Sequence, residues 1–391
     1  MEARPDIPLP DAPALVAGPA AAVWLDRDGE IHTRPLDRVA RLLREAPPPL
    51  LCHLPATAKR LGVDPFPALD LLELYAFARP GRFCVPTPRG LAAALGLEPP
   101  ADREAEAIAL PRMAAALLAD LSEGSGAARE DALRVARAMA AGGWRWGRAV
   151  LAALGASADD MPAAPWRGLE AWRHLPEWEE QAPPPPPGNL PVAPVEARRR
   201  LSDLLGEEAE PRPSQADYAS AVSAAFAPRD ERGSPRFVLA EAGTGVGKTL
   251  GYIAPASLWA EKNEAPVWIS TFTRNLQHQI DGELDRLYPD AAIKERQVVI
   301  RKGRENYLCL LNMEEAVKGV AVRRPDAVAL GLLARWVGAT RDGDLSGGGF
   351  PAWLADIAGR GRTLGLADRR GECVYSACPH YGRCFIEEGV R

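Results

Sequence analysis

Apolar and polar positions follow different patterns before and after residue 181. In the first part, residues 20–36 predict a β-hairpin, because an apolar run leads into a turn at Asp28-Gly29 and then a second strand. Residues 49–55 predict a short buried strand. Apolar residues at helical spacing predict helices over three further stretches, the last of which should kink or restart at Pro111. These stretches are 67–80, 87–96 and 106–121.

Beyond residue 195, predicted strands alternate with predicted helices. The strands are expected at 236–243, 265–273 and 296–303, and the helices at 197–206, 213–227, 247–262 and 274–288. This alternation is typical of a parallel sheet that carries helices on both faces. The sequence therefore predicts an α/β fold for this part.

A proline-rich stretch gives the clearest domain boundary. Five consecutive prolines lie at 183–187, within a linker predicted at 182–195, because such a run favours extended polyproline II and cannot pack into a core. The expected domains are a smaller α/β domain at 1–125, a Trp-rich helical segment at 126–181, and a larger domain at 196–391. The tryptophans of the helical segment are expected to form a core, with a base-stacking surface as the alternative.

Composition narrows the class of protein. The chain has 391 residues, a net charge of -5 and an apolar fraction of 47%, as in ordinary soluble globular proteins. Because the net charge of the chain is negative, a site that binds nucleic acid would need a local basic groove. The N-terminus shows no secretory pattern and no apolar run approaches a membrane span, so a cytoplasmic protein without membrane contact is expected. In that reducing compartment, clustered cysteines predict metal or redox ligands before disulfides.

A phosphate-binding loop is predicted between the strand at 236–243 and the helix that follows it. The stretch "AGTGVGKT" matches G-x-x-x-x-G-K-[ST], except that Ala242 occupies the first position. Glycines allow backbone N–H groups to converge on phosphate oxygens, and the helix adds its positive end. Lys248 would reach the terminal phosphates and Thr249 would bind Mg²⁺. The expected ATP-binding residues are Gly243, Thr244, Gly245, Val246, Gly247, Lys248 and Thr249.

The loop and the stretch "WISTFTRNLQHQI" resemble superfamily 2 DNA helicases of the DinG/XPD type, which carry an iron–sulfur cluster. The resemblance implies a RecA-like motor domain, with Ser270, Thr271 and Thr273 as contacts to single-stranded or forked DNA. Each of these hydroxyl residues could equally be a helix cap. The stretch "RPSQADY" resembles the Q-motif, which implies that Gln215 contacts the adenine of ATP.

The same resemblance implies a helical iron–sulfur insertion at about 301–390. Its [4Fe–4S] ligands would be the thiolates of Cys309, Cys373, Cys378 and Cys384. Zinc is the alternative metal, although zinc sites favour paired C-x₂₋₄-C spacings, and unligated cysteines are the third possibility. Cys52 and Cys84 are expected in the core.

The N-terminal domain resembles DnaQ-like 3′–5′ exonucleases of RNase H-like fold, without their metal carboxylates. Ala58, Ala105 and Leu110 stand where the resemblance expects acidic or histidine ligands, and Asp70 is the one retained carboxylate. Asp26, Asp28 and Glu30 lie near a turn and do not match D-x-E. Because one carboxylate cannot hold two metal ions, a domain without nuclease activity is expected.

These features predict the N-terminal portion of an ATP-dependent DNA helicase. No D-E-x-H box follows "GKT", and the resemblance expects a Walker B strand and a second lobe beyond Arg391, so the isolated chain is expected to bind ATP without turnover. The alternative is a non-catalytic, nucleotide-dependent module that binds nucleic acid or a protein partner. A third interpretation keeps the N-terminal domain as an active nuclease.

Overall fold

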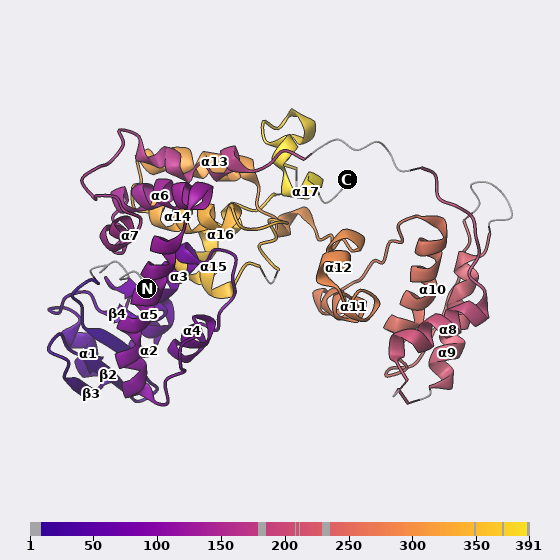
Figure 1. Cartoon of the computed structure of the whole chain (residues 1–391), viewed down its shortest axis with the longest axis horizontal. Coiled ribbons are helices and arrows are strands. Elements are labelled where there is room, and N and C mark those ends of the chain that lie inside the picture. Colours follow the sequence, from indigo (N-terminus) through magenta and orange to yellow (C-terminus); the bar gives the residue numbers. More distant parts are fainter. Residues whose placement is uncertain are drawn as a thin grey trace. The chain divides into compact units, whose positions relative to one another are not determined.

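The computed structural model describes residues 9–178, 185–207, 209–210, 212–228, 235–347, 349–369 and 371–388. The chain divides into two compact units (Figure 1). The first unit comprises Met1–Glu179 together with Arg301–Arg391, and the second comprises Glu180–Ile300. Most of the linker predicted at 182–195 lies within the described part of the second unit, while 182–184 lie outside the described residues.

The first unit contains a mixed five-stranded sheet in the order β3-β2-β1-β4-β5. β2 is antiparallel to both β1 and β3, whereas β1, β4 and β5 run parallel. The strands are β1 Ala14–Ala17, β2 Ala21–Leu25, β3 Ile31–Pro35, β4 Leu50–Leu51 and β5 Leu69–Asp70. The predicted hairpin is confirmed as β2 and β3, joined by a turn in which Gly29 adopts a φ of 87° that favours glycine. The predicted buried strand is confirmed as β4.

Both faces of the sheet are covered. Alternate residues of β1 point to opposite faces, so Leu15 and Ala17 join one core cluster while Ala14 and Val16 join another. The helices of the first unit are α1 Leu36–Leu42, α2 Leu54–Leu61, α3 Leu71–Ala78, α4 Pro88–Ala94, α5 Arg103–Glu123, α6 Gly126–Ala141, α7 Gly147–Ala153, α13 Leu310–Lys318, α14 Asp326–Val337, α15 Ala352–Ala358, α16 Arg360–Gly365 and α17 Phe385–Glu388. Pro111 lies inside α5 without dividing it, contrary to the predicted restart.

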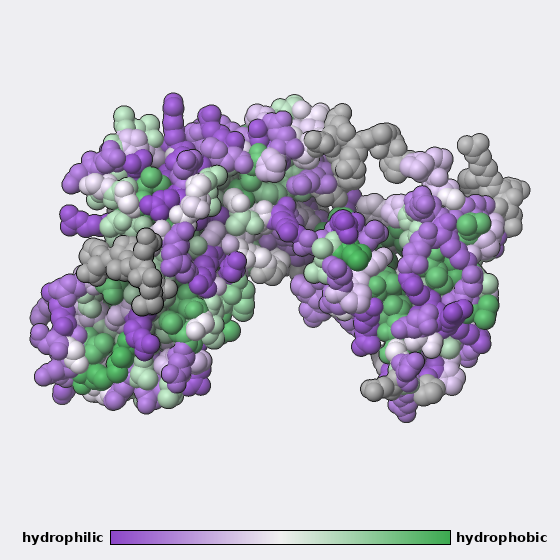
Figure 2. Space-filling model, in the orientation of Figure 1, coloured by the Kyte–Doolittle hydropathy of each residue, from purple (hydrophilic) through white to green (hydrophobic). Residues whose placement is uncertain are grey.

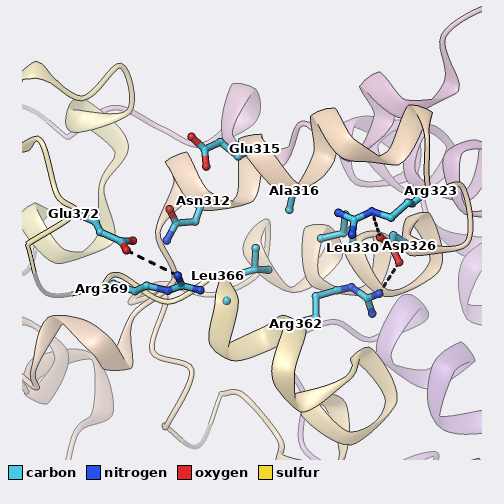
Figure 3. A pocket seen from close by; sticks show the side chains of 11 residues that line it. Asn312, Glu315, Ala316, Arg323, Asp326, Leu330, Arg362, Leu366, Arg369 and Glu372 are labelled. Atoms are coloured by element: carbon cyan, nitrogen blue, oxygen red, sulfur yellow. Dashed lines mark hydrogen bonds and ion pairs between the residues drawn. The ribbon is translucent and has the colours of Figure 1, made fainter.

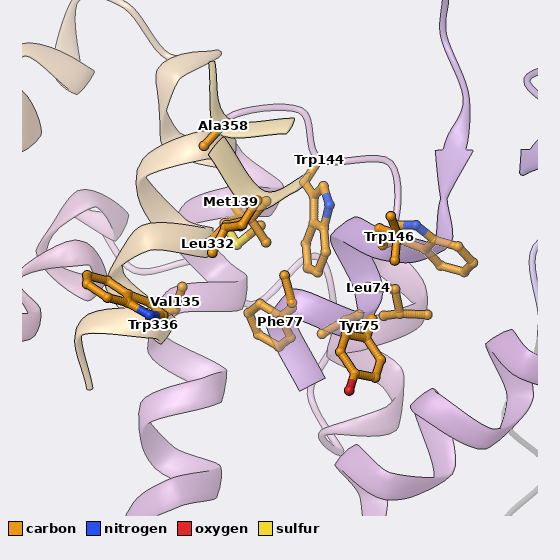
Figure 4. Close-up of a cluster of buried hydrophobic side chains, with 14 of the residues drawn as sticks. Leu74, Tyr75, Phe77, Val135, Met139, Trp144, Trp146, Leu332, Trp336 and Ala358 are labelled. Atoms are coloured by element: carbon orange, nitrogen blue, oxygen red, sulfur yellow. The ribbon is translucent and has the colours of Figure 1, made fainter. Parts of the chain in front are cut away.

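The largest core joins distant parts of the sequence. Figure 4 shows part of this core, in which Phe77 and Trp144 belong to the same cluster as Leu332 and Trp336 of α14. Arg335 of α14 adds a polar connection, because it pairs with Asp131 of α6 at 2.7 Å and donates to the carbonyl of Phe77 at 3.1 Å. The tryptophans Trp144, Trp146 and Trp172 are buried, which agrees with the core interpretation.

This shared core changes the predicted division of the chain. Residues 196–391 were expected to form one domain, but the structure places 301–391 with the N-terminal part and leaves 180–300 as a separate unit. The reason is the apolar face of α14, which is buried against α3 and α6, while α13 packs on α14 and joins the same core. Since burial of apolar surface depends on shape rather than sequence distance, a linker does not have to separate two cores.

The second unit consists of helices in its described residues: α8 Pro194–Leu205, α9 Pro213–Ser223, α10 Lys248–Asn263, α11 Arg274–Leu287 and α12 Ala291–Gln297. The three predicted strands at 236–243, 265–273 and 296–303 form no sheet. Their apolar side chains are exposed, Phe237 by 84% and Phe272 by 97%, and Figure 2 shows apolar residues on the surface around α8–α10. A parallel strand needs a paired neighbour and cover on both faces, and these segments have neither.

No helix within the described residues is long and apolar enough to span a membrane.

Glu73 of α3 gives a pH-dependent prediction. Burial, assisted by the charge of Asp70, raises the pKa of Glu73 to about 8, against the opposing hydrogen bond from Trp144 Nε1 at 3.1 Å. Between the ordinary pKa of 4.5 and about 8 only the unfolded state releases this proton, so stability is lost as pH rises through this window. Glu73→Gln should therefore raise the melting temperature at pH 8 and have little effect near pH 5. Thermal unfolding of both proteins, with exposed Glu130→Gln as control, tests this; a pH-independent difference would contradict it.

Candidate functional site

The loop from Ala242 to Gly247 leads directly into α10. Gly245 and Gly247 have φ values of 81° and 84°, in the left-handed region where glycine is favoured. The second of these glycines is the residue before Lys248, which begins α10. The sequence-predicted phosphate-binding residues therefore form one continuous turn at a helix N-terminus, the arrangement that directs backbone N–H groups toward an anion.

Gln215 of α9 fixes one side of this loop. Its side chain is 2% exposed, and its Nε2 donates to the carbonyl of Gly247 at 2.8 Å. A Cβ on Gly247 would lie 2.3 Å from that nitrogen, and the φ of 84° also favours glycine at this position. The Oε1 atom of Gln215 is buried and has no hydrogen-bond partner among the described residues. The structure thus brings Gln215 to the loop, where its contact is with backbone.

Lys248 folds back over its own loop. Its ammonium group donates to the carbonyls of Ala242 and Gly243, both at 2.9 Å. The neighbouring Thr249 hydroxyl hydrogen-bonds with Tyr252, one turn further along α10. A bound phosphate would replace the carbonyl partners of Lys248 with stronger, charge-assisted ones.

The three predicted DNA-contact residues lie before α11. Thr273 is its N-cap, since its Oγ1 accepts from the N–H of Leu276 at 3.2 Å, and Thr271 Oγ1 donates to the carbonyl of Thr273 at 3.3 Å. Ser270 is exposed. Helix capping, the alternative considered for these residues, therefore applies to Thr273.

Short backbone pairings bring Cys309 toward the three later cysteines. Leu308 forms a β-bridge with Ala367, and the N–H of Cys309 donates to the carbonyl of Leu366 at 2.8 Å. Cys309 is then the N-cap of α13. The other three cysteines flank the short 3₁₀ turns Tyr375–Ala377 and Tyr381–Arg383: Cys378 and Cys384 directly follow them, and Cys373 lies two residues before the first.

Hydrogen-bond donors point at three of the four sulfur atoms. Burial raises the pKa of Cys309, while the N–H groups of Asn312 and Leu311 oppose that shift. Burial likewise raises the pKa of Cys384, against the N–H groups of Glu387 and Ile386. The sulfur of Cys373 accepts from Arg304 at 2.9 Å and from the N–H of Tyr375 at 3.4 Å. Donors of this kind stabilise thiolates, the form that binds metal, so the surroundings fit a thiolate-ligated group.

The spacing of these sulfurs bears on the zinc alternative. Among the described residues, Asp26, Glu30 and His32 are the one group of three potential ligands within 4.8 Å of one another. No three of the cysteine sulfurs are that close. Tetrahedral zinc, with Zn–S bonds of about 2.3 Å, needs sulfurs roughly 3.8 Å apart. The cysteines as placed therefore do not form a zinc site.

Ion pairs occupy most of the basic residues around the cysteines. Arg304 pairs with Asp368 at 2.7 Å and with Glu387 at 3.1 Å. Lys302 pairs with Asp344, and Arg383 pairs with Glu177 at 2.7 Å. The positive charges of these three residues are therefore balanced by neighbouring carboxylates.

His380, which lies between Cys378 and Cys384 in the sequence, is buried. It is 6% exposed, its Nε2 lies 2.6 Å from a carboxylate oxygen of Glu314, and its ring packs edge-on against Trp172. The carboxylate of α13 and the Trp ring together bury the imidazole. His380 thus connects the cysteine segment to the rest of the first unit.

A pocket of about 590 Å³ lies beside the cysteine segments (Figure 3). Its three arginines are ion-paired: Arg362 and Arg323 with Asp326 at 2.6 and 3.4 Å, and Arg369 with Glu372 at 3.8 Å. Glu315 also lines the pocket, so its three acidic side chains balance the charge of its three arginines. As it stands, this pocket offers no excess positive charge to a polyanion.

The N-terminal carboxylates are not assembled into one site. Asp70 is 1% exposed and accepts hydrogen bonds from the N–H groups of His53, Leu54 and Leu72 at 2.6–2.9 Å. Asp26 and Glu30 lie at the other edge of the sheet, because Leu25 pairs with Ala14 at the amino end of β1. Ala58 and Leu110 are buried. Burial raises the pKa of Cys84 to about 12, and the buried position of this residue confirms it as part of the core.

Comparison with known proteins identifies relatives over part of the chain. It is 35% identical over 179 residues to the ATP-dependent DNA helicase YoaA of Escherichia coli, covering 45% of this chain and 26% of that protein. It is 32% identical over 198 residues to the ATP-dependent helicase DinG of Mycobacterium tuberculosis, covering 45% and 28%. The 3'-5' exonuclease DinG of Bacillus subtilis is 32% identical over 148 residues, covering 38% and 15%. The chain thus spans between 15% and 28% of the length of these relatives. No family model and no solved structure matches it.

Proposed function

Because the chain is similar over part of its length to DinG-type helicases, we propose that it is a portion of an ATP-dependent DNA helicase. In this proposal the turn at Ala242–Gly247 and the start of α10 bind the phosphates of ATP, and Thr249 supplies a ligand to Mg²⁺. The observation that carries the proposal is the glycine turn with Lys248 and Gln215 both directed at it.

The proposal assigns the four cysteines to a [4Fe–4S] cluster. Cys309, Cys373, Cys378 and Cys384 would hold it, and the N–H donors around three of the sulfurs would stabilise the thiolates. When bound, the cluster supplies a rigid cross-link between α13 and the C-terminal segment, which has little core of its own. Arg304 would position Cys373 through its guanidinium group.

The proposed partner is single-stranded or forked DNA. The support is the relatives' description as DNA helicases, together with the hydroxyl-bearing segment 270–273 in the same unit as the phosphate loop. An iron–sulfur insertion at 301–390 belongs to the same proposal. The RecA-like arrangement expected for the motor domain does not, because the described residues of this unit form no sheet. The proposed N-terminal domain has lost nuclease chemistry, since Asp70 has its oxygens engaged by backbone N–H groups.

Nucleotide affinity tests the proposal. Lys248→Ala should weaken ATP binding at least tenfold, which corresponds to about 1.4 kcal/mol, because it removes the charge that faces the terminal phosphates. Calorimetric titration of the full chain with ATP and Mg²⁺ measures this. Lys59→Ala, which removes an exposed lysine on α2, is the matched control. Equal ATP affinity in the parent and Lys248→Ala proteins would contradict the assignment.

A further inference from the structure

A second cavity, of about 230 Å³, lies at the carboxyl ends of β1 and β4 in the first unit. Gly18 and Cys52 directly follow these two neighbouring parallel strands. The side chains used below that line it are Cys52, Thr57, Arg60, Thr87, Arg103 and Glu106. The carboxyl edge of parallel strands is where α/β sheets commonly bind ligands.

Two arginines converge on the end of β1. Arg60 of α2 donates from Nη1 to the carbonyl of Ala17 at 3.0 Å. Arg103, in the first turn of α5, lies against the next residue, since a Cβ on Gly18 would be 2.6 Å from its Cζ. Arg103 makes no hydrogen bond or ion pair with any described residue, and Arg60 makes only that one bond. Two guanidinium groups thus lie over adjacent backbone positions with most of their donors unused.

The remaining lining does not neutralise this charge. Glu106 is the one acidic side chain of the cavity, and it forms no ion pair within 4.0 Å among the described residues. Burial raises the pKa of Glu106, with Arg103 opposing. Burial, with the charge of Asp70, raises the pKa of Cys52 well above its usual range, so its thiol stays neutral. The cavity therefore has a net positive charge and a single carboxylate, which suits an anion and does not suit a hard cation.

We propose that this cavity binds a phosphate group through Arg60 and Arg103. Guanidinium forks match phosphate oxygens in two-pronged hydrogen bonds, and the buried hydroxyl of Thr57 adds a neutral polar group to the wall. The volume is below the roughly 300–1,000 Å³ of pockets for drug-sized ligands, so the ligand is inorganic phosphate or one terminal phosphate of a nucleic acid. The site is independent of the phosphate loop, which lies in the other unit.

Phosphate binding by the full chain tests this proposal. The phosphate loop also attracts phosphate, so equilibrium dialysis with labelled inorganic phosphate is done in the Lys248→Ala background. One phosphate per chain should remain bound there, and adding Arg103→Gln or Arg60→Gln should weaken it at least tenfold. Glu106→Gln should strengthen it. Arg38→Gln, which removes an exposed arginine of α1 outside the cavity, should leave it unchanged.

Two outcomes would overturn the proposal: no phosphate binding in the Lys248→Ala protein, or equal binding after both arginine substitutions. Circular dichroism checks that each variant is folded. Competition then identifies the source of the phosphate. Displacement by an oligonucleotide with a terminal phosphate, but not by the same oligonucleotide ending in hydroxyl groups, supports a nucleic-acid end. Displacement by free phosphate alone supports inorganic phosphate as the ligand.

Discussion

Cys309→Ser is expected to abolish the proposed iron–sulfur cluster. The parent protein, purified without oxygen, should be brown and contain about four irons per chain, as a four-thiolate [4Fe–4S] cluster requires. Serine offers a hydroxyl in place of the thiolate at the start of α13, where two backbone N–H groups stabilise a negative sulfur. Iron analysis and visible absorbance of the parent and variant measure the effect.

Cys52→Ser is the matched control for this experiment. Cys52 is also half-buried, but it lies in the sheet region and outside the proposed ligand set, so its replacement should leave the iron content unchanged. Stoichiometric zinc without iron in the anaerobic parent would contradict the cluster assignment. Full iron content in Cys309→Ser would show that this residue is not a ligand.

Loss of the cluster should destabilise the segment 371–388 and leave α13 and α14 folded. α13 and α14 are anchored by apolar residues such as Met313 and Leu333, both fully buried in the large core of the first unit. Of the described residues 371–388, Phe385 is the one that joins this core, and the rest of the segment consists mainly of short 3₁₀ turns linked to α13 by the His380–Glu314 contact. Increased proteolysis confined to this segment is therefore the expected secondary result.

Local elements could be predicted from the sequence because each depends on residues that are close together along the chain. The hairpin at β2–β3 and the start of α10 depend on a few neighbouring residues, such as Gly29 and Gly247, whose positive φ values follow from glycine's lack of a side chain. The same holds for the glycine turn at Ala242–Gly247, whose residues are consecutive. The helix does not restart at Pro111, because residues on both sides of it, such as Leu110 and Met113, hold α5 in the core.

Long-range packing could not be predicted in this way. Nothing in the helical spacing of 326–337 specifies that α14 buries Trp336 in the same core as Trp144. The sheet predicted from the strands at 236–303 does not form in the described residues. Strand-like segments need pairing partners, and the local sequence does not specify them. The proximity of Arg60 and Arg103 at the end of β1 could not be predicted either. These residues are 43 positions apart in the sequence and come together only in the folded chain.

Trp336→Ala is expected to destabilise the whole first unit, by about 3–5 kcal/mol for the loss of a fully buried Trp. Trp336 is 1% exposed, its Nε1 donates to the carbonyl of Gly349 at 2.7 Å, and its ring packs edge-on against Phe350. Because α14 shares its core with α3 and α6, the cost should appear in the N-terminal sheet as well as in α14.

Hydrogen exchange in increasing denaturant measures this coupling. In the parent, amides of β1 and α14 should become unprotected at the same denaturant concentration, and Trp336→Ala should lower that concentration for both. Phe83→Ala, which removes an aromatic side chain that is 62% exposed in the same unit, should change stability by less than about 0.5 kcal/mol. If Trp336→Ala exposed α14 while β1 kept its parental protection, residues 301–391 would be a separate folding unit. The single core would then be a packing contact between two independently stable parts.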